Sequence, residues 1–254
     1  MIFGDVSLDI GDDAVATVEI HRPPHNYFDQ ALLRSLAEAY ATVDARSDCR
    51  AIVLCAEGKS FCAGAQLARP SAQSDGPSTL YAEAARLFES AMPVVAAVQG
   101  AAIGGGLGLA CAADFRVACP EARFAANFAR LGFHHGFALT VTLPLIVGQQ
   151  AALDLLYTGR RIGGEEAARL GLCDRLVDPA SVRDAAHALA TEIAGSAPLA
   201  VRAIRATMRR DLVAGVRDAM ANEAAEQERL RTTNDFVEGV RATAERRPPR
   251  FEGR

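Results

Sequence analysis

Three adjacent glycines, Gly104 to Gly106, are the residues of this chain best suited to chemistry. They follow the short apolar stretch 94–98 and precede an Ala- and Leu-rich segment with helical character. Glycine lets the backbone turn tightly and lets a ligand come close to bare N–H groups. Because these N–H groups lie at the positive end of the expected helix, they can hold an oxygen that gains negative charge. The segment therefore predicts an oxyanion site, although it contains no evident acid or base.

A second glycine-containing loop, residues 58–67, follows the short apolar stretch 51–55. Two such loops that leave neighbouring parallel strands can aim two backbone N–H groups at one point, where a thioester oxygen could become enolate-like or tetrahedral. Either loop alone is a weak signal, because glycines after strands are common. A dinucleotide-binding motif fits poorly, since Leu109 stands where its third glycine would be.

The elements that position these loops alternate between strand and helix patterns. Apolar runs predict strands at 6–10, 15–20, 51–55, 94–98 and 114–118. Asp29 can cap a helix that runs to about Arg46, another helix is expected at 79–91, and a third follows the glycines. This alternation indicates an α/β fold with a mostly parallel sheet and helices packed against it.

From residue 149 onward the pattern is largely helical. Helices are expected at 151–157, 164–170, 180–194, 199–209 and 213–229, and only 173–177 is strand-like. We therefore predict two parts, an α/β core over residues 1–195 that holds the site and a helical C-terminal region over residues 196–254.

Composition excludes several classes of protein. The 254 residues are half hydrophobic, and a formal charge of −4 argues against a nucleic-acid surface. The six cysteines form no CxxC pair and no His stands at metal-ligand spacing, which predicts no metal site and a reduced, cytoplasmic protein. The apolar run 94–113 is long enough to suggest a membrane span. Pro93, Gln99 and the glycines argue against one, so no membrane association is expected.

Taken together, the two loops resemble those of the enoyl-CoA hydratase/isomerase family, also called the crotonase family. The resemblance covers essentially the whole chain. Its segments are Arg22-Pro23 with Asn26, residues 61–67, 98–106 with 113–114, 155–159 with 167–172, 235–240 and the basic tail.

The resemblance implies a crotonase-like spiral of βα units with a helical C-terminal trimerisation region, in a homotrimer or a dimer of trimers. It implies no prosthetic group, with coenzyme A present as part of an acyl-CoA substrate. The positions that match the family's oxyanion donors are the backbone N–H groups of Ala65 and Gly105. The positions that match its coenzyme A site are Ala63, Gln66, Leu67 and, in the basic tail, Arg246.

The family's two hydratase glutamates are missing from this chain. Their positions are Gly108 and Phe128, neither of which can transfer a proton. The chain is therefore more similar to the branch that contains chlorobenzoyl-CoA dehalogenase and epoxyphenylacetyl-CoA isomerase. That branch has an aspartate at the position of Gly136, which is also absent. His134 and His135 stand directly before this position and could supply an acid or base near neutral pH, with His135 preferred. In the structural alternative, one histidine caps the helix or faces solvent while the other packs.

Other polar side chains have structural interpretations. His25 is expected to be a surface histidine, and Cys62 a small neutral filler because no basic partner is adjacent. Glu83 and Glu89 are expected on the solvent face of their helix. Residues 165–166 are both Glu and would stabilise a helix N-terminus.

These features predict an enzyme that stabilises the oxyanion of an acyl-CoA. They favour isomerisation or other enolate chemistry over hydration by two glutamates. One alternative is hydrolysis of a thioester or of a carbon–carbon bond. Another is a non-catalytic protein that binds acyl-CoA.

Overall fold

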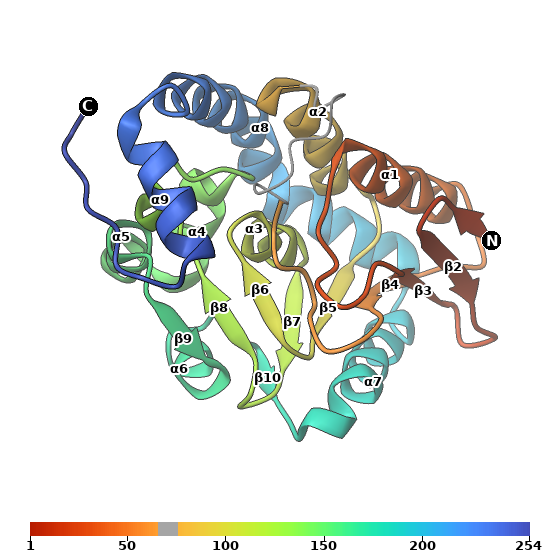
Figure 1. The fold of residues 1–254 in the computed structure, drawn as a ribbon. Coiled ribbons are helices and arrows are strands. Elements are labelled where there is room, and N and C mark those ends of the chain that lie inside the picture. Colours follow the sequence, from red (N-terminus) through yellow and green to blue (C-terminus); the bar gives the residue numbers. More distant parts are fainter. Residues whose placement is uncertain (66–75) are drawn as a thin grey trace.

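A computed structural model describes residues 1–65 and 76–254. Its large sheet has the strand order β1-β2-β3-β4-β5-β7-β10 (Figure 1). The strands are β1 (Ile2–Phe3), β2 (Val6–Ile10), β3 (Val15–Ile20), β4 (Ala51–Ala56), β5 (Val94–Val98), β7 (Phe115–Ala118) and β10 (Arg175–Leu176). The pairs from β3 to β10 are parallel, and only β1-β2 and β2-β3 are antiparallel, which confirms the mostly parallel sheet.

A small second sheet lies beside the glycines. It has the order β6-β8-β9, with β6 (Ala101–Ile103), β8 (Arg123–Ala125) and β9 (Arg161–Gly163). The sequence did not predict this sheet, because three-residue strands are too short to show a periodicity. The apolar run 94–113 is thereby divided among β5, β6 and the following helix α3 (Gly105–Ala112).

Helices pack against the large sheet and against one another. They are α1 (Gln30–Asp44), α2 (Pro77–Phe88), α3, α4 (Leu139–Val147), α5 (Gln149–Thr158), α6 (Gly164–Arg169), α7 (Val182–Ala194), α8 (Pro198–Leu230) and α9 (Asn234–Ala244). Helix α7 packs across β3, β4, β5 and β7, while α1 lies against β1, β2 and β3 and also contacts α2 (Figure 1). No helix of the described residues could span a bilayer, judged by length and apolarity together.

The buried core follows from these contacts. All six residues of β4 are buried because the strand lies between two parallel neighbours. Asp29 caps α1 as predicted, since its carboxylate accepts the Leu32 N–H at 2.8 Å.

The C-terminal helices differ from the prediction. The two helices expected at 199–209 and 213–229 are one continuous helix, α8, because residues 210–212 contain no Gly or Pro that would end it. Helix α8 packs along α2 and α4 (Figure 1). The boundary predicted at residue 195 falls between α7 and α8, and the division into two parts stays a prediction.

Candidate functional site

The two glycine loops lie side by side. The Ile103 N–H donates to the Cys62 carbonyl oxygen at 3.0 Å, which joins the loop after β4 to the end of β6. Gly64 has a φ of +91°, and a Cβ there would lie 2.8 Å from the Ile103 oxygen and 3.7 Å from the Gly105 nitrogen. Only glycine tolerates this backbone with so close a neighbour. The segment that ends in Ala65 is therefore adjacent to the start of α3.

Two backbone N–H groups at this junction have no acceptor in the described part of the chain. They belong to Ala65, at the end of the first loop, and to Gly105, the first residue of α3. Gly104 precedes the helix with a φ of +57°, and its own N–H is held by the Ala125 oxygen at 2.8 Å. The fold thus leaves available the two N–H groups predicted as oxyanion donors, although their role stays a prediction.

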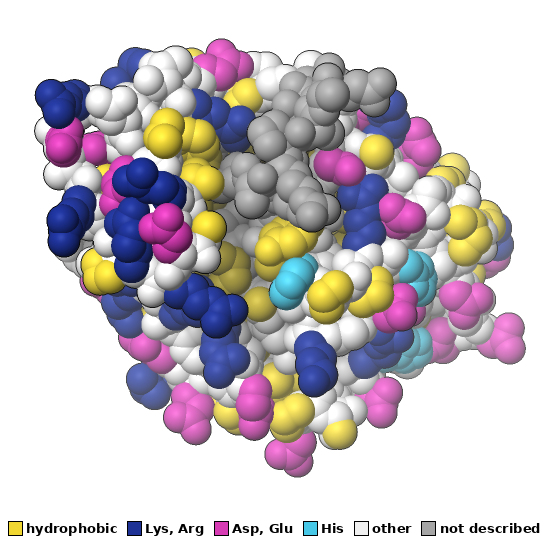
Figure 2. Space-filling view, viewed as in Figure 1, with side chains coloured by type: hydrophobic (Ala, Val, Ile, Leu, Met, Phe, Trp, Pro, Cys, Tyr) yellow, Lys and Arg dark blue, Asp and Glu magenta, His cyan; other side chains and the backbone are white. Residues whose placement is uncertain are grey.

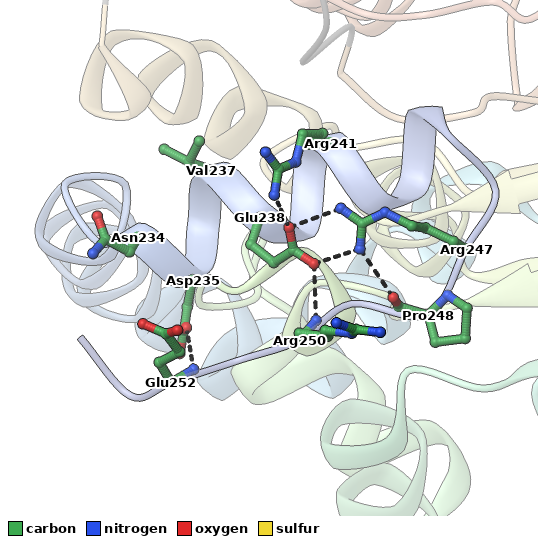
Figure 3. A pocket seen from close by; sticks show the side chains of 9 residues that line it. All are labelled: Asn234, Asp235, Val237, Glu238, Arg241, Arg247, Pro248, Arg250 and Glu252. Atoms are coloured by element: carbon green, nitrogen blue, oxygen red, sulfur yellow. Dashed lines mark hydrogen bonds and ion pairs between the residues drawn. The ribbon is translucent and has the colours of Figure 1, made fainter.

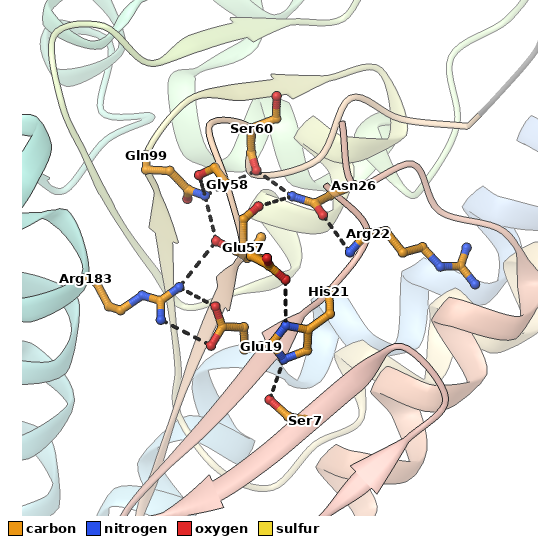
Figure 4. A network of polar contacts seen from close by, with 11 residues as sticks. Ser7, Glu19, His21, Arg22, Asn26, Glu57, Gly58, Ser60, Gln99 and Arg183 are labelled. Atoms are coloured by element: carbon orange, nitrogen blue, oxygen red, sulfur yellow. Dashed lines mark hydrogen bonds and ion pairs between the residues drawn. The ribbon is translucent and has the colours of Figure 1, made fainter. Parts of the chain in front are cut away.

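Two side-chain amides, the buried Asn26 and the half-buried Gln99, hold the first loop in place. Asn26 donates from Nδ2 to the main-chain carbonyl oxygen of Glu57 at 2.8 Å and to that of Ser60 at 2.7 Å (Figure 4). Gln99 donates from Nε2 to the oxygens of Ala56, at 2.8 Å, and of Ser60, at 3.2 Å. These amides satisfy loop carbonyls that no strand partner reaches.

The wall beside the glycines is aromatic. A Cβ at Gly105 would lie 2.4 Å from Phe28 Cζ, and one at Gly108 would lie 2.4 Å from Phe137 Cβ. The rings of Phe28 and Phe137 meet edge to face at 5.5 Å. Phe128 is also buried, and its ring lies 3.7 Å from where a Cβ of Gly104 would be. Both positions that match the hydratase glutamates are therefore closed by phenylalanine.

The position that matches the aspartate is filled by a tyrosine hydroxyl. A Cβ at Gly136 would lie 1.7 Å from Tyr81 Oη. That hydroxyl donates to Gln227 Oε1 at 3.1 Å, and Gln227 Nε2 donates to the His134 oxygen at 3.0 Å. Both side chains are buried, and burial raises the pKa of Tyr81 above its usual value. The sequence offered no signal for this pair, because α2 and α8 meet only in the fold.

The two predicted histidines lie together in the turn before α4. Their rings stack with centroids 4.0 Å apart, and the His134 ring nitrogen Nδ1 lies 2.8 Å from the His135 oxygen. The His135 side chain is 19% exposed. Desolvation, followed by the neighbouring charge of His134, lowers the pKa of His135 to about 4. His135 is therefore neutral at pH 7 and able to accept a proton.

A buried glutamate that the sequence analysis missed stands behind His135. Glu223, on α8, is wholly buried and accepts the Ala138 N–H at 2.8 Å, the Thr140 N–H at 3.0 Å and the Thr140 hydroxyl at 2.6 Å. Thr140 Oγ1 also lies 2.8 Å from His135 Nε2. Desolvation raises the pKa of Glu223, while these donors act to lower it. Glu223 and Thr140 stand 83 positions apart in the chain, so local patterns could not pair them.

Comparison with known proteins decides the family. The family model described as enoyl-CoA hydratase/isomerase matches residues 11–254. The chain belongs to this family. It is 33% identical to the (E)-benzylidenesuccinyl-CoA hydratase of Thauera aromatica, over 98% of this chain and 99% of that protein. It is 30% identical to the carnitinyl-CoA dehydratase of Salmonella enteritidis, over 94% and 95% respectively.

Solved structures of the family share the fold. The crystal structure of an enoyl-CoA hydratase/isomerase from Pseudoalteromonas atlantica has a TM-score of 0.87 to this chain at 28% identity, and covers 98% of this chain and 100% of that one. The crotonase fold is thereby confirmed. The narrower assignment to the branch without hydratase glutamates stays a prediction.

The residues matched to the family's coenzyme A site are only partly placed. The Ala63 N–H donates to the His25 oxygen at 2.9 Å, whereas Gln66 and Leu67 lie outside the described residues. On the face of the molecule shown in Figure 2, hydrophobic side chains gather in a hollow near the middle, and Lys and Arg side chains lie below it.

The basic tail folds back along α9. Arg246 is exposed, with a left-handed φ of +55°. Its neighbour Arg247 is ion-paired with Glu238 at 2.5 Å, and Glu238 also pairs with Arg241 at 2.7 Å (Figure 3). These side chains and Arg250 line a groove of about 800 Å³ between α9 and the tail. Arg247 is therefore committed within the tail, whereas Arg246 faces solvent.

The remaining candidates have the structural roles expected of them, with one exception. His25 is exposed, and burial raises the pKa of the Cys62 thiol to about 12, which keeps it neutral. The prediction for Glu83 is wrong, because its side chain is only 14% exposed and is held by Arg34 and Arg86. Glu89 is exposed as predicted. Among the described residues, no group of three or more His, Cys, Asp or Glu could hold a metal ion.

Proposed function

We propose that this chain polarises the carbonyl of an acyl-CoA thioester between the N–H groups of Ala65 and Gly105, and catalyses isomerisation or another enolate-type reaction. The observation that carries the proposal is the pairing of an aromatic wall with two N–H groups that have no acceptor within residues 1–65 and 76–254. The N–H groups can stabilise an enolate oxygen. The wall closes the positions where the family's hydratases have glutamates, as Phe137 does at Gly108.

The proton carrier in this proposal is His135, with His134 stacked against it. When the Cα–H bond breaks, the proton moves to an imidazole nitrogen and the electron pair passes into the thioester, where the oxyanion forms. Return of that proton to a different carbon completes an isomerisation. The neutral state of His135 at pH 7 supports its role as the base.

Solvent exchange tests this reaction. In deuterium oxide, the enzyme should introduce deuterium at Cα of a saturated acyl-CoA, measured by mass spectrometry. His135→Gln should slow the exchange by about 10²–10⁴-fold, the usual contribution of a positioned acid or base. The matched control is His187→Gln, on α7, whose side chain is 42% exposed and should leave the rate unchanged. Equal rates in the wild type, His134→Gln and His135→Gln would refute the histidine mechanism.

Hydration or dehydration is the second candidate, favoured by the names of the two relatives. In this case a neutral histidine would activate water, and ¹⁸O from labelled water would enter Cβ of an enoyl-CoA. Release of free thiol would instead indicate thioester hydrolysis. Clear binding without turnover across a broad acyl-CoA panel would favour a protein that only binds acyl-CoA.

Coenzyme A is proposed as part of the substrate, with no prosthetic group. The exposed cation of Arg246 supports contact with a coenzyme A phosphate, because phosphates favour a local cation even on an acidic protein. Arg246→Ala should therefore weaken binding of acyl-CoA but not of the same acyl group on a short thiol without phosphates.

A homotrimer or a dimer of trimers is proposed as the assembly. Leu199, Ile204 and Met208 on α8 are 63–80% exposed, which favours burial against another copy. Sedimentation velocity would distinguish these assemblies from a monomer.

A cytoplasmic location is also proposed, since all six cysteines are unpaired and buried.

A further inference from the structure

We propose that Glu223 and Thr140 are positioning residues that fix the tautomer of His135, with the proton on Nε2 and the lone pair on Nδ1. The use of Nδ1 as the base rests on the proposed function, whereas the tautomer itself does not.

The direction of each hydrogen bond follows from the groups involved. Both Glu223 oxygens face N–H donors, Oε2 that of Ala138 and Oε1 that of Thr140, so the carboxylate acts only as an acceptor. The Thr140 hydroxyl has one proton, and it donates that proton to Glu223 Oε1 at 2.6 Å. The Thr140 oxygen can therefore only accept from His135 Nε2, which lies 2.8 Å away. His135 must carry its proton on Nε2.

The other ring nitrogen is left available. Among the described residues no hydrogen bond engages His135 Nδ1. The stacked His134 carries a proton on Nδ1, because this nitrogen faces the His135 carbonyl oxygen, which can only accept. Nδ1 of His135 is therefore the nitrogen of this ring that carries no proton.

An ion pair does not explain this arrangement. His135 Nε2 lies 3.8 Å from Glu223 Oε1, but His135 is neutral at pH 7. The carboxylate acts through the threonine hydroxyl, in the way that a metal-bound or catalytic histidine is oriented by a partner on its far nitrogen.

The test is the ¹⁵N NMR spectrum of histidine-labelled protein, which distinguishes protonated from unprotonated ring nitrogens. His135→Gln identifies the His135 signals. In the wild type and in Thr140→Ser, His135 should carry its proton on Nε2. Thr140→Val removes the acceptor and should raise the ratio of the Nδ1–H to the Nε2–H tautomer by roughly fivefold, the worth of one hydrogen bond.

Glu223→Gln should shift the tautomer ratio in the same direction, because an amide has one acceptor oxygen where the carboxylate has two. Glu226→Gln, on the same helix but paired with Arg229, is the control and should leave the ratio unchanged. A wild-type His135 protonated on Nδ1, or a Thr140→Val ratio equal to the wild-type ratio, would overturn the proposal. The spectrum is independent of turnover, so an assigned tautomer combined with unaffected exchange in His135→Gln would refute only the proposed function.

Discussion

Replacing Asn26 with alanine should loosen the loop that carries Ala65. The Asn26 side chain is wholly buried and makes three hydrogen bonds, two from Nδ2 to the Glu57 and Ser60 oxygens and one from the Arg22 N–H to Oδ1 at 3.0 Å. Ser60 keeps a second donor, so the change deprives two partly buried groups of their partner, the Glu57 main-chain oxygen and the Arg22 N–H.

The size of the effect follows from that count. Each polar group left unsatisfied costs about 1–3 kcal/mol, which gives roughly 2–6 kcal/mol for the pair. Asn26 also has a φ of +50°, where asparagine is tolerated and alanine costs about 1 kcal/mol more. We expect the free energy of unfolding to fall by roughly 3–7 kcal/mol.

Urea unfolding at fixed protein concentration measures this loss, and acyl-CoA exchange measures its effect on the site. Asn234→Ala is the matched control, because this asparagine is exposed and its loss should change stability by less than about 0.5 kcal/mol. Without urea, and at a temperature where the variant is folded, deuterium exchange in Asn26→Ala should still be slower than in the wild type, because the Ala65 N–H is displaced. A variant with wild-type stability would refute the view that this amide holds the loop.

Three further results are expected. Gly108→Glu should fail to introduce hydratase activity and should lower the yield of folded protein, because its Cβ would lie 2.4 Å from Phe137 Cβ; a soluble, active variant would contradict this. Tyr81→Phe should lower the free energy of unfolding by about 1 kcal/mol, because Gln227 loses one hydrogen bond, as calorimetry or urea unfolding would show. His135 has a pKa of about 4 when folded and about 6.5 when unfolded, so the unfolded chain binds more protons between these values and stability should fall as the pH drops from 6.5 to 4. His135→Gln should remove a contribution of on the order of 3 kcal/mol to this loss, and an unchanged pH dependence would refute the assignment.

Much of the fold could be predicted because it depends on local patterns. The six apolar residues of β4, the Asp29 cap and the glycines before α3 each act through neighbours close in the chain. Strands of two or three residues, such as β6, have too few residues to show a period. The continuity of α8 was not evident, because its buried residues all lie in its C-terminal half, between Val216 and Gln227.

The sequence by itself determined the family, the two backbone turns and the absence of carboxylates at Gly108, Phe128 and Gly136. Only the tertiary structure decided what fills the space beside Gly108 and Gly136, since Phe137 and Tyr81 reach it from elsewhere in the chain. It also brought Glu223 to Thr140 across 83 positions, which is what orients His135. The physical reason is that hydrogen-bond direction and steric exclusion depend on atoms within a few ångströms, and no periodicity in the chain records which distant segments those atoms belong to.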